Sequence, residues 1–219
     1  MKEFQHTIGT PQTVKGVGLH TGEAVNMTFH PAPENHGIIF KRVDLEGQPL
    51  VHADVDLVID TSRGTTLSEN GAQVHTVEHV MAALAASGVD DILIELDGPE
   101  PPITDGSAWA FMAAIRSAGI EKQAAIREVF EIQEAASYRE TDRNVELAAL
   151  PDKDYSLSVL IDYNSDILAP QQVGLDNIAD FEDQFAKART FCFLHELEML
   201  YKNNLIKGGD LNNAIVVVD

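Results

Sequence analysis

Two histidines and a glutamate stand close together in the segment His75-Thr76-Val77-Glu78-His79. On a helix, residues four apart share one face, so His75 and His79 could hold a divalent metal ion. Glu78 could then act as general base on a water molecule whose pKa the metal lowers. The H-x-x-E-H pattern is typical of inverzincin metalloproteases. A surface or helix-capping role for the same residues is an equally open interpretation.

The residues that follow predict a helix from Thr76 to Ser87. Apolar side chains recur there at helical spacing, several alanines add helix propensity, and Gly88 is a favourable C-terminal stop. Thr76 is predicted to be the N-cap, which places His75 just outside the helix and pointing elsewhere. The pattern therefore favours Glu78 and His79 over His75 as functional residues.

Other residue types suggest chemistry less strongly. His20, in the glycine-rich loop Gly16 to Gly22, lines a site or simply bonds to backbone in a turn. Asp105 and Ser107 form an acid–nucleophile pair or, more commonly, a helix cap. Cys192, three residues before a histidine, is a nucleophile or a buried structural thiol, and the second reading is favoured.

The C-terminal third adds a hydroxyl and an apolar stripe. Thr190 could donate a hydrogen bond to a substrate, or could cap a helix. Leu194, Leu197 and Leu200 recur at helical spacing, which is ordinarily a core stripe and alternatively a wall that binds lipid.

The elements that carry these residues predict an α+β fold. Residues 4–58 are expected to form strands and turns. Further along the chain we expect a strand at 92–96, a helix at 108–119, strands at 129–132, 145–147 and 155–163, helices within 180–202 and a strand at 214–218. The pattern restarts near residue 128, so the expected domains are 1–127 and 128–219. The second begins like the first but lacks a covering helix, which predicts that the chain is C-terminally truncated.

Composition excludes several classes of protein. The 219 residues carry 15 basic and 35 acidic side chains, a net charge of −20, and no visible basic patch, so nucleic-acid binding is not expected. No apolar run reaches about 18 residues, so stable membrane insertion is not expected. A single cysteine and the absence of a signal peptide predict a cytoplasmic protein.

Six short motifs, taken together and in order, resemble the UDP-3-O-acyl-N-acetylglucosamine deacetylases, zinc enzymes of lipid A biosynthesis. They are GVGLHTG at 16–22, HPAP at 30–33, TVEH at 76–79, PEPPITDGSA at 99–108, ARTF at 188–191 and GG at 208–209 before AIVV. DTSRGTT at 60–66 is similar to the branch of this family fused to a 3-hydroxyacyl-carrier-protein dehydratase. A fused or associated dehydratase domain is thus an expected partner.

The resemblance implies two related domains, each a sheet layer packed on helices as a two-layer sandwich, with the second incomplete here. It implies a zinc ion with His79 as one ligand, Glu78 as general base and Thr190 as a donor to the oxyanion. It gives no counterpart to His75. Residues expected to bind the UDP-sugar acyl substrate are Leu19, His20, Phe191, Leu194, Leu197, Leu200, Ile206, Gly208, Gly209, Ala214 and Val216.

In the family, the remaining zinc ligands lie on an H-K-x-x-D helix, which is expected beyond residue 219. The fragment alone is therefore expected to bind zinc weakly and to show no turnover. The alternatives are an inverzincin-like protease that uses His75, Glu78 and His79, and an inactive fragment of the deacetylase fold.

Overall fold

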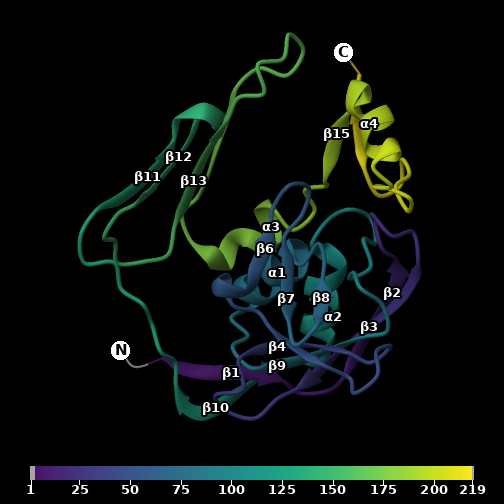
Figure 1. The fold of residues 1–219 in the computed structure, drawn as a ribbon. Helices are drawn as coiled ribbons and strands as arrows, with labels where there is room; N and C mark the ends of the chain where they lie inside the picture. The colour runs from purple at the N-terminus through teal and green to yellow at the C-terminus, as the bar shows by residue number, and fades with distance from the viewer. Residues whose placement is uncertain (1–2, 219) are drawn as a thin grey trace.

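The computed structural model describes residues 3–218, so the first two residues and the last residue of the predicted domains lie outside the described part. The fold is α+β, as predicted, with sheets and helices packed in layers (Figure 1). The elements up to residue 126 are β1 (Phe4–Ile8), β2 (Gln12–Val17), β3 (Ala24–Pro31), β4 (Ile38–Arg42), β5 (Leu50–His52), β6 (Val58–Asp60), β7 (Thr66–Glu69), β8 (Ala72–Val74), α1 (Glu78–Ser87), β9 (Ile92–Leu96), α2 (Trp109–Ala118) and β10 (Ile120–Ile126).

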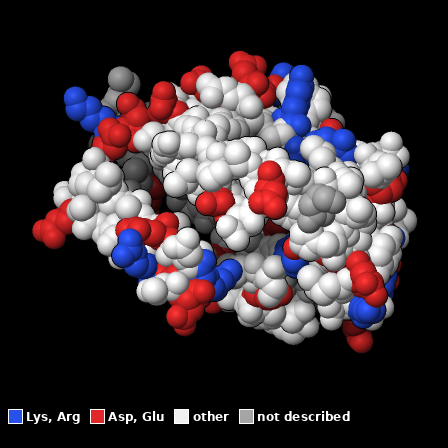
Figure 2. Space-filling view, turned by 90° about the horizontal axis from the view of Figure 1, so that it is seen from above, with Lys and Arg blue, Asp and Glu red and all other residues white. Residues whose placement is uncertain are grey.

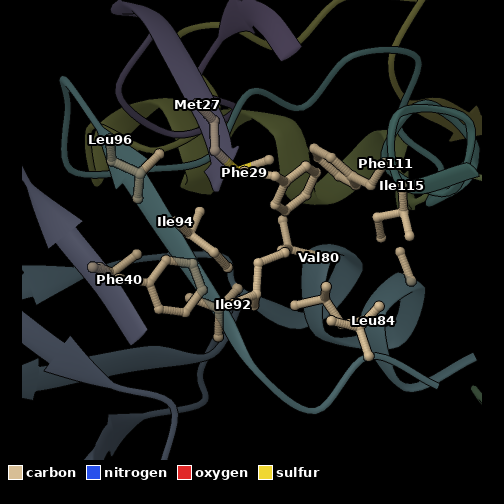
Figure 3. Packing of buried hydrophobic residues seen from close by; sticks show 14 of the residues in the cluster. Met27, Phe29, Phe40, Val80, Leu84, Ile92, Ile94, Leu96, Phe111 and Ile115 are labelled. Carbon is tan, nitrogen blue, oxygen red and sulfur yellow. The ribbon is translucent and has the colours of Figure 1, made fainter. Parts of the chain in front are cut away.

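A five-stranded sheet in the order β2-β3-β9-β4-β5 forms one layer, and α1 and α2 cover it. On the central strand β9, Ile92, Ile94 and Leu96 are fully buried and alternate with less buried residues. Because strand side chains alternate between faces, these three point together into the core. Figure 3 shows them against Val80 of α1, which is also fully buried.

Both helices of the first half were predicted, but α1 begins at Glu78 and not at Thr76. Thr76 has a positive φ of 55°, so its backbone is not in the right-handed helical conformation. Its hydroxyl bonds to Glu100 and does not cap the helix, so the predicted N-cap is wrong. At α2 the hydroxyl of Ser107 accepts from Trp109 N at 3.2 Å, which confirms the capping interpretation of Ser107.

The second half consists of hairpins and short helices. Its elements are β11 (Ala136–Glu140), β12 (Val145–Ala149), β13 (Leu157–Ile161), β14 (Gln171–Leu175), α3 (Phe181–Gln184), β15 (Phe191–Phe193), α4 (Leu197–Lys202) and β16 (Ile215–Val217). β11 pairs with β12 and β13 with β14, and all five residues of β13 are exposed. In Figure 1 these hairpins project away from the body formed by the first half.

The second half departs from the sequence predictions at two places. Residues 129–132 form no strand, and Phe130 is 93% exposed, because the apolar run finds neither a partner strand nor a buried surface among the described residues. Residues 180–202 contain the predicted helices as α3 and α4, but the strand β15 between them was not predicted. The aromatic residues of β15 favour a strand, and β16 supplies its parallel partner.

The surface carries many charges without a continuous basic area on the face shown in Figure 2, where acidic and basic side chains are scattered. No helix among residues 3–218 has the length and apolar character needed to cross a membrane.

Glu95, on the outer face of β9, gives a test of the sheet. It accepts from Lys41 Nζ at 3.0 Å and pairs with His30 Nε2 at 3.1 Å. The hydrogen bond from Lys41 is the main cause that lowers the pKa of Glu95. A carboxyl with a lowered folded pKa stabilises the fold above its unfolded pKa of about 4.3, and this stabilisation is lost as the pH falls through the folded value.

We therefore expect Glu95→Gln to reduce the free energy of unfolding by about 0.5–1 kcal/mol at neutral pH and by much less near pH 3, measured by urea denaturation. Glu46→Gln, at an exposed acid, is the control and should have little effect at either pH. A Glu95→Gln difference that does not change with pH would contradict this account.

Candidate functional site

Glu78 and His79 open the first turn of α1. Glu78 Oε2 accepts from the backbone N–H of Thr65 at 2.9 Å, and the backbone oxygen of Thr65 accepts from Val77 N at 3.3 Å. The residues before β7 therefore hold both the start of the helix and one oxygen of the carboxylate. Among the described residues no hydrogen bond to Glu78 Oε1 is present, so that oxygen is free to take a proton.

Burial lowers the pKa of His79, and the nearby carboxylates of Glu78 and Asp105 oppose this shift only in part. A lowered pKa favours the neutral imidazole, which is the form that binds a metal ion. Within residues 3–218, however, no group of three or more His, Cys, Asp or Glu side chains could hold a metal. The described residues therefore do not form a complete metal site by themselves.

His75 does not share a helical face with His79, because α1 begins after it. Its Nδ1 lies 3.1 Å from Thr66 Oγ1, and its backbone N–H donates to Pro99 O at 2.9 Å. The ring lines a cavity of about 400 Å³ together with His20 and Arg63. The i, i+4 metal pair that the protease interpretation needs is therefore not formed.

The carboxylate of Glu100, 1% exposed, links the glycine-rich loop to the start of α1. It accepts from the hydroxyl of Thr76 at 2.8 Å, from both the N–H and the hydroxyl of Thr21, and from the N–H of His20. Four donors satisfy the two buried oxygens, and the bond to Thr76 holds that residue at its positive φ. Local sequence patterns predict no role for Glu100, because its hydrogen-bond partners are far away along the chain.

The glycine-rich loop also contacts the segment near the predicted GG motif. Gly208 N donates to Leu19 O at 3.0 Å, and Ile206 N donates to His20 Nδ1 at 3.4 Å. A Cβ atom at Gly208 would overlap the carbonyl oxygen of Gly18, so only glycine allows this approach. Gly209 N bonds back to Ile206 O at 3.0 Å.

Thr190 is joined to the loop that precedes α2. Its N–H donates to Gly106 O at 2.8 Å, and Arg189 Nε donates to Asp105 O at 2.7 Å. Gly106 has a φ of 86°, and a Cβ there would overlap the backbone oxygen of Asn213. The backbone of the first half thus positions Thr190 directly.

The residues of the second half that were predicted to contact the sugar (Phe191) or the acyl chain lie in two environments. Phe191 lines a cavity of about 240 Å³ whose other lining residues include Ile161, Tyr163, Ile215 and Val217, none of which was predicted. Ala214 and Val216 alternate with Ile215 and Val217 along the chain and do not line this cavity. On the other element, Leu194 is 45% exposed, Leu197 is partly buried and Leu200 is buried.

Cys192 is partly buried, and burial together with the nearby Glu196 carboxylate raises the pKa of its thiol. The thiol form is the weaker nucleophile, so the structural interpretation of Cys192 is favoured.

Comparisons with known proteins give one consistent result. A family model described as UDP-3-O-acyl N-acetylglycosamine deacetylase matches residues 5–219. The chain is 45% identical over 215 residues to a protein of Bacteroides thetaiotaomicron named bifunctional enzyme LpxC/FabZ, covering 98% of this chain and 47% of that protein. It is 44% identical over 214 residues to a UDP-3-O-acyl-N-acetylglucosamine deacetylase of Myxococcus xanthus, covering 97% of this chain and 68% of that protein. The chain thus spans about half the length of the bifunctional relatives that it matches.

Glu100→Ala tests the role of the buried carboxylate. We expect a loss of about 3 kcal/mol in the free energy of unfolding, because several buried donors lose their acceptor. Urea denaturation measures the loss, and limited proteolysis should show faster cleavage within residues 16–22. Glu23→Ala, at an exposed acid beside the same loop, is the matched control. Equal effects of the two substitutions would refute a special role for Glu100.

Proposed function

Because the chain belongs to the UDP-3-O-acyl N-acetylglycosamine deacetylase family, we propose that the protein of which it forms part hydrolyses the N-acetyl group of a UDP-3-O-acyl-N-acetylglucosamine, with release of acetate, in lipid A biosynthesis in the cytoplasm. The observation that carries the proposal is that hydrogen bonds tie Glu78, His20 and Thr190 to shared loops of the first half, although they are far apart in the sequence.

Zinc is the proposed cofactor, with His79 as the one ligand from residues 3–218 and the others from a segment after residue 219. The longer relatives support a further segment of this kind. A bound zinc ion would supply Lewis acidity and lower the pKa of a water molecule. Burial of His79 supports this role because it favours the metal-binding form of the ring.

Glu78 is proposed to accept the proton of the attacking water at Oε1, because Thr65 N–H occupies Oε2. Thr190 is proposed to donate its hydroxyl hydrogen to the oxyanion that forms on the acetyl carbonyl. Its backbone N–H and carbonyl are both engaged, with Gly106 and Ile215, so the main chain at Thr190 is held in place. Such pre-organisation allows a donor to stabilise charge without reorganising.

The substrate's sugar and acyl chain are proposed to contact the remaining predicted residues. Phe191 lies beside the apolar cavity of about 240 Å³, which supports an apolar contact at this position. The set proposed to bind substrate is Leu19, His20, Phe191, Leu194, Leu197, Leu200, Ile206, Gly208, Gly209, Ala214 and Val216.

We also propose two domains that meet at residues 127 and 128. Support comes from Arg127, the last residue of the first proposed domain. Its backbone N–H donates to Glu3 O at 2.9 Å, and its guanidinium pairs with Asp90 at 2.8 Å, so this residue binds back to the first domain. A fused dehydratase domain is proposed from the bifunctional relatives.

The proposal is tested with the protein encoded by the complete reading frame. Glu78→Gln should lower kcat/KM for acetate release by about 100-fold or more, because the general base is lost, while the zinc content stays at the wild-type level. Acetate release and bound zinc are measured on the same preparations.

His79→Ala and His75→Ala form a matched pair in that protein. His79→Ala should lose zinc and activity, whereas His75→Ala should retain zinc, because His75 lies outside α1. Zinc lost with His75→Ala but kept with His79→Ala would reverse the assignment, and a wild-type protein that releases no acetate would refute the proposed function.

A further inference from the structure

Residues 63–65 contact several parts of the proposed site. Thr65 N–H donates to Glu78 Oε2 at 2.9 Å, and the backbone oxygen of Arg63 lies 3.2 Å from His20 Nε2. The Arg63 guanidinium donates from Nη2 to Glu196 Oε1 at 2.8 Å. One short segment therefore touches the proposed base, the glycine-rich loop and the second half of the chain.

Glu196 sits at the centre of the apolar stripe, between Leu194 and Leu197, in the turn that leads into α4. Its second oxygen, Oε2, accepts from the N–H of Phe193 at 3.0 Å. The hydrogen bond from Arg63 is the main cause that lowers the pKa of Glu196. An Arg–carboxylate bond is charge-assisted, and here the carboxylate is also fixed to the backbone of β15.

Arg63 also lines a cavity beside the glycine-rich loop. The cavity of about 400 Å³ lies between residues 59–66 on one side and residues 204–207 on the other, and Arg63 is among its lining residues. The ion pair joins residues 63–65 directly to the turn before α4, so a shift of that turn can be transmitted to residues 63–65 through Arg63.

We propose that Arg63 is a positioning residue for the deacetylation reaction, whose ion pair with Glu196 couples the seating of the substrate's acyl chain on residues 194–200 to the placement of Glu78. The inference rests on the proposed function. Binding energy from a remote part of a substrate can be used to orient groups at the reacting centre, so that truncated substrates lose kcat. Through Arg63, a long acyl chain acts on the same backbone segment that holds Glu78.

The test uses the protein encoded by the complete reading frame and two substrates, one with a long 3-O-acyl chain and one with a 3-O-acetyl group. Arg63→Ala and Glu196→Gln should each lower kcat for the long-chain substrate about tenfold, with KM nearly unchanged and with less than about a twofold effect on the short one. The exchanged pair, Arg63→Glu with Glu196→Arg, should restore most of the preference for the long chain.

Arg139→Ala is the matched control, because Arg139 also pairs with a glutamate, Glu146, at 2.7 Å, but on the β11–β12 hairpin. It should leave both substrates unaffected. Equal kcat ratios in wild type and Arg63→Ala, or a proportional loss on both substrates, would overturn the positioning role.

Cys192 provides a readout that does not depend on activity. Glu196 raises the pKa of its thiol and Arg63 lowers it. Arg63→Ala should therefore slow alkylation of Cys192 at mildly alkaline pH, and Glu196→Gln should speed it, as followed by mass spectrometry of the peptide that contains Cys192. Unchanged alkylation in both variants would refute the ion pair itself. A wild-type protein that releases no acetate would refute the proposed function, but the alkylation result would still stand.

Discussion

The arrangement of the site depends on one buried carboxylate. Glu100 is almost fully buried, and the four donors around it come from the glycine-rich loop and from Thr76, two residues before α1. A buried charge is tolerated only when hydrogen bonds satisfy it, so these segments must close around Glu100 together. Once they have closed, the position at which α1 starts is determined, and Glu78 and His79 follow from it.

The same closure prepares the docking surface for the second half. The backbone oxygens of Leu19 and His20 point to Gly208 and Lys207, and the oxygen of Gly106 accepts from Thr190. These are main-chain contacts, which explains why glycine is needed where a Cβ would overlap the backbone of the partner loop. The first half therefore supplies the template on which Thr190 is placed.

Local patterns predicted the elements whose causes are local. The apolar stripe of α1, the strand β9 and the Ser107 cap are predicted directly from neighbouring residues, and the structure confirms them. The predicted N-cap at Thr76 failed because its hydroxyl finds an acceptor 24 residues away, in Glu100. β15 was not predicted because its partner strand β16 comes after α4 in the sequence. Short-range periodicity carries no information about a pairing between residues so far apart in the chain.

For the site, residue types and order were enough to single out Glu78, His79 and Thr190, whereas Glu100, Thr65 and Arg63 were not recognised. The difference is physical: the roles proposed for the first group rest on side chains of a recognisable type, whereas the second group makes contacts with residues far away in the chain, which no local pattern shows.

The two halves of the chain differ in how many apolar residues they bury, and this difference bears on how Thr190 is held. Most buried apolar residues belong to the first half, and after residue 127 the buried apolar residues are Leu175, Ala186, Phe193 and Leu200. Ala186 is fully buried within the core cluster of the first half, and Phe181 packs against the same cluster. Residues 181–186 are therefore anchored on a rigid layer, while the hairpins before them are largely exposed. A segment with few buried contacts opens more readily than a packed core.

Thr190 lies only four residues beyond Ala186. Its position is fixed by the anchored segment 181–186 and by the hydrogen bond of its backbone N–H to Gly106. The role proposed for Thr190, donation to a developing charge, requires a donor that is held in place beforehand, and the contacts with the first half provide that support.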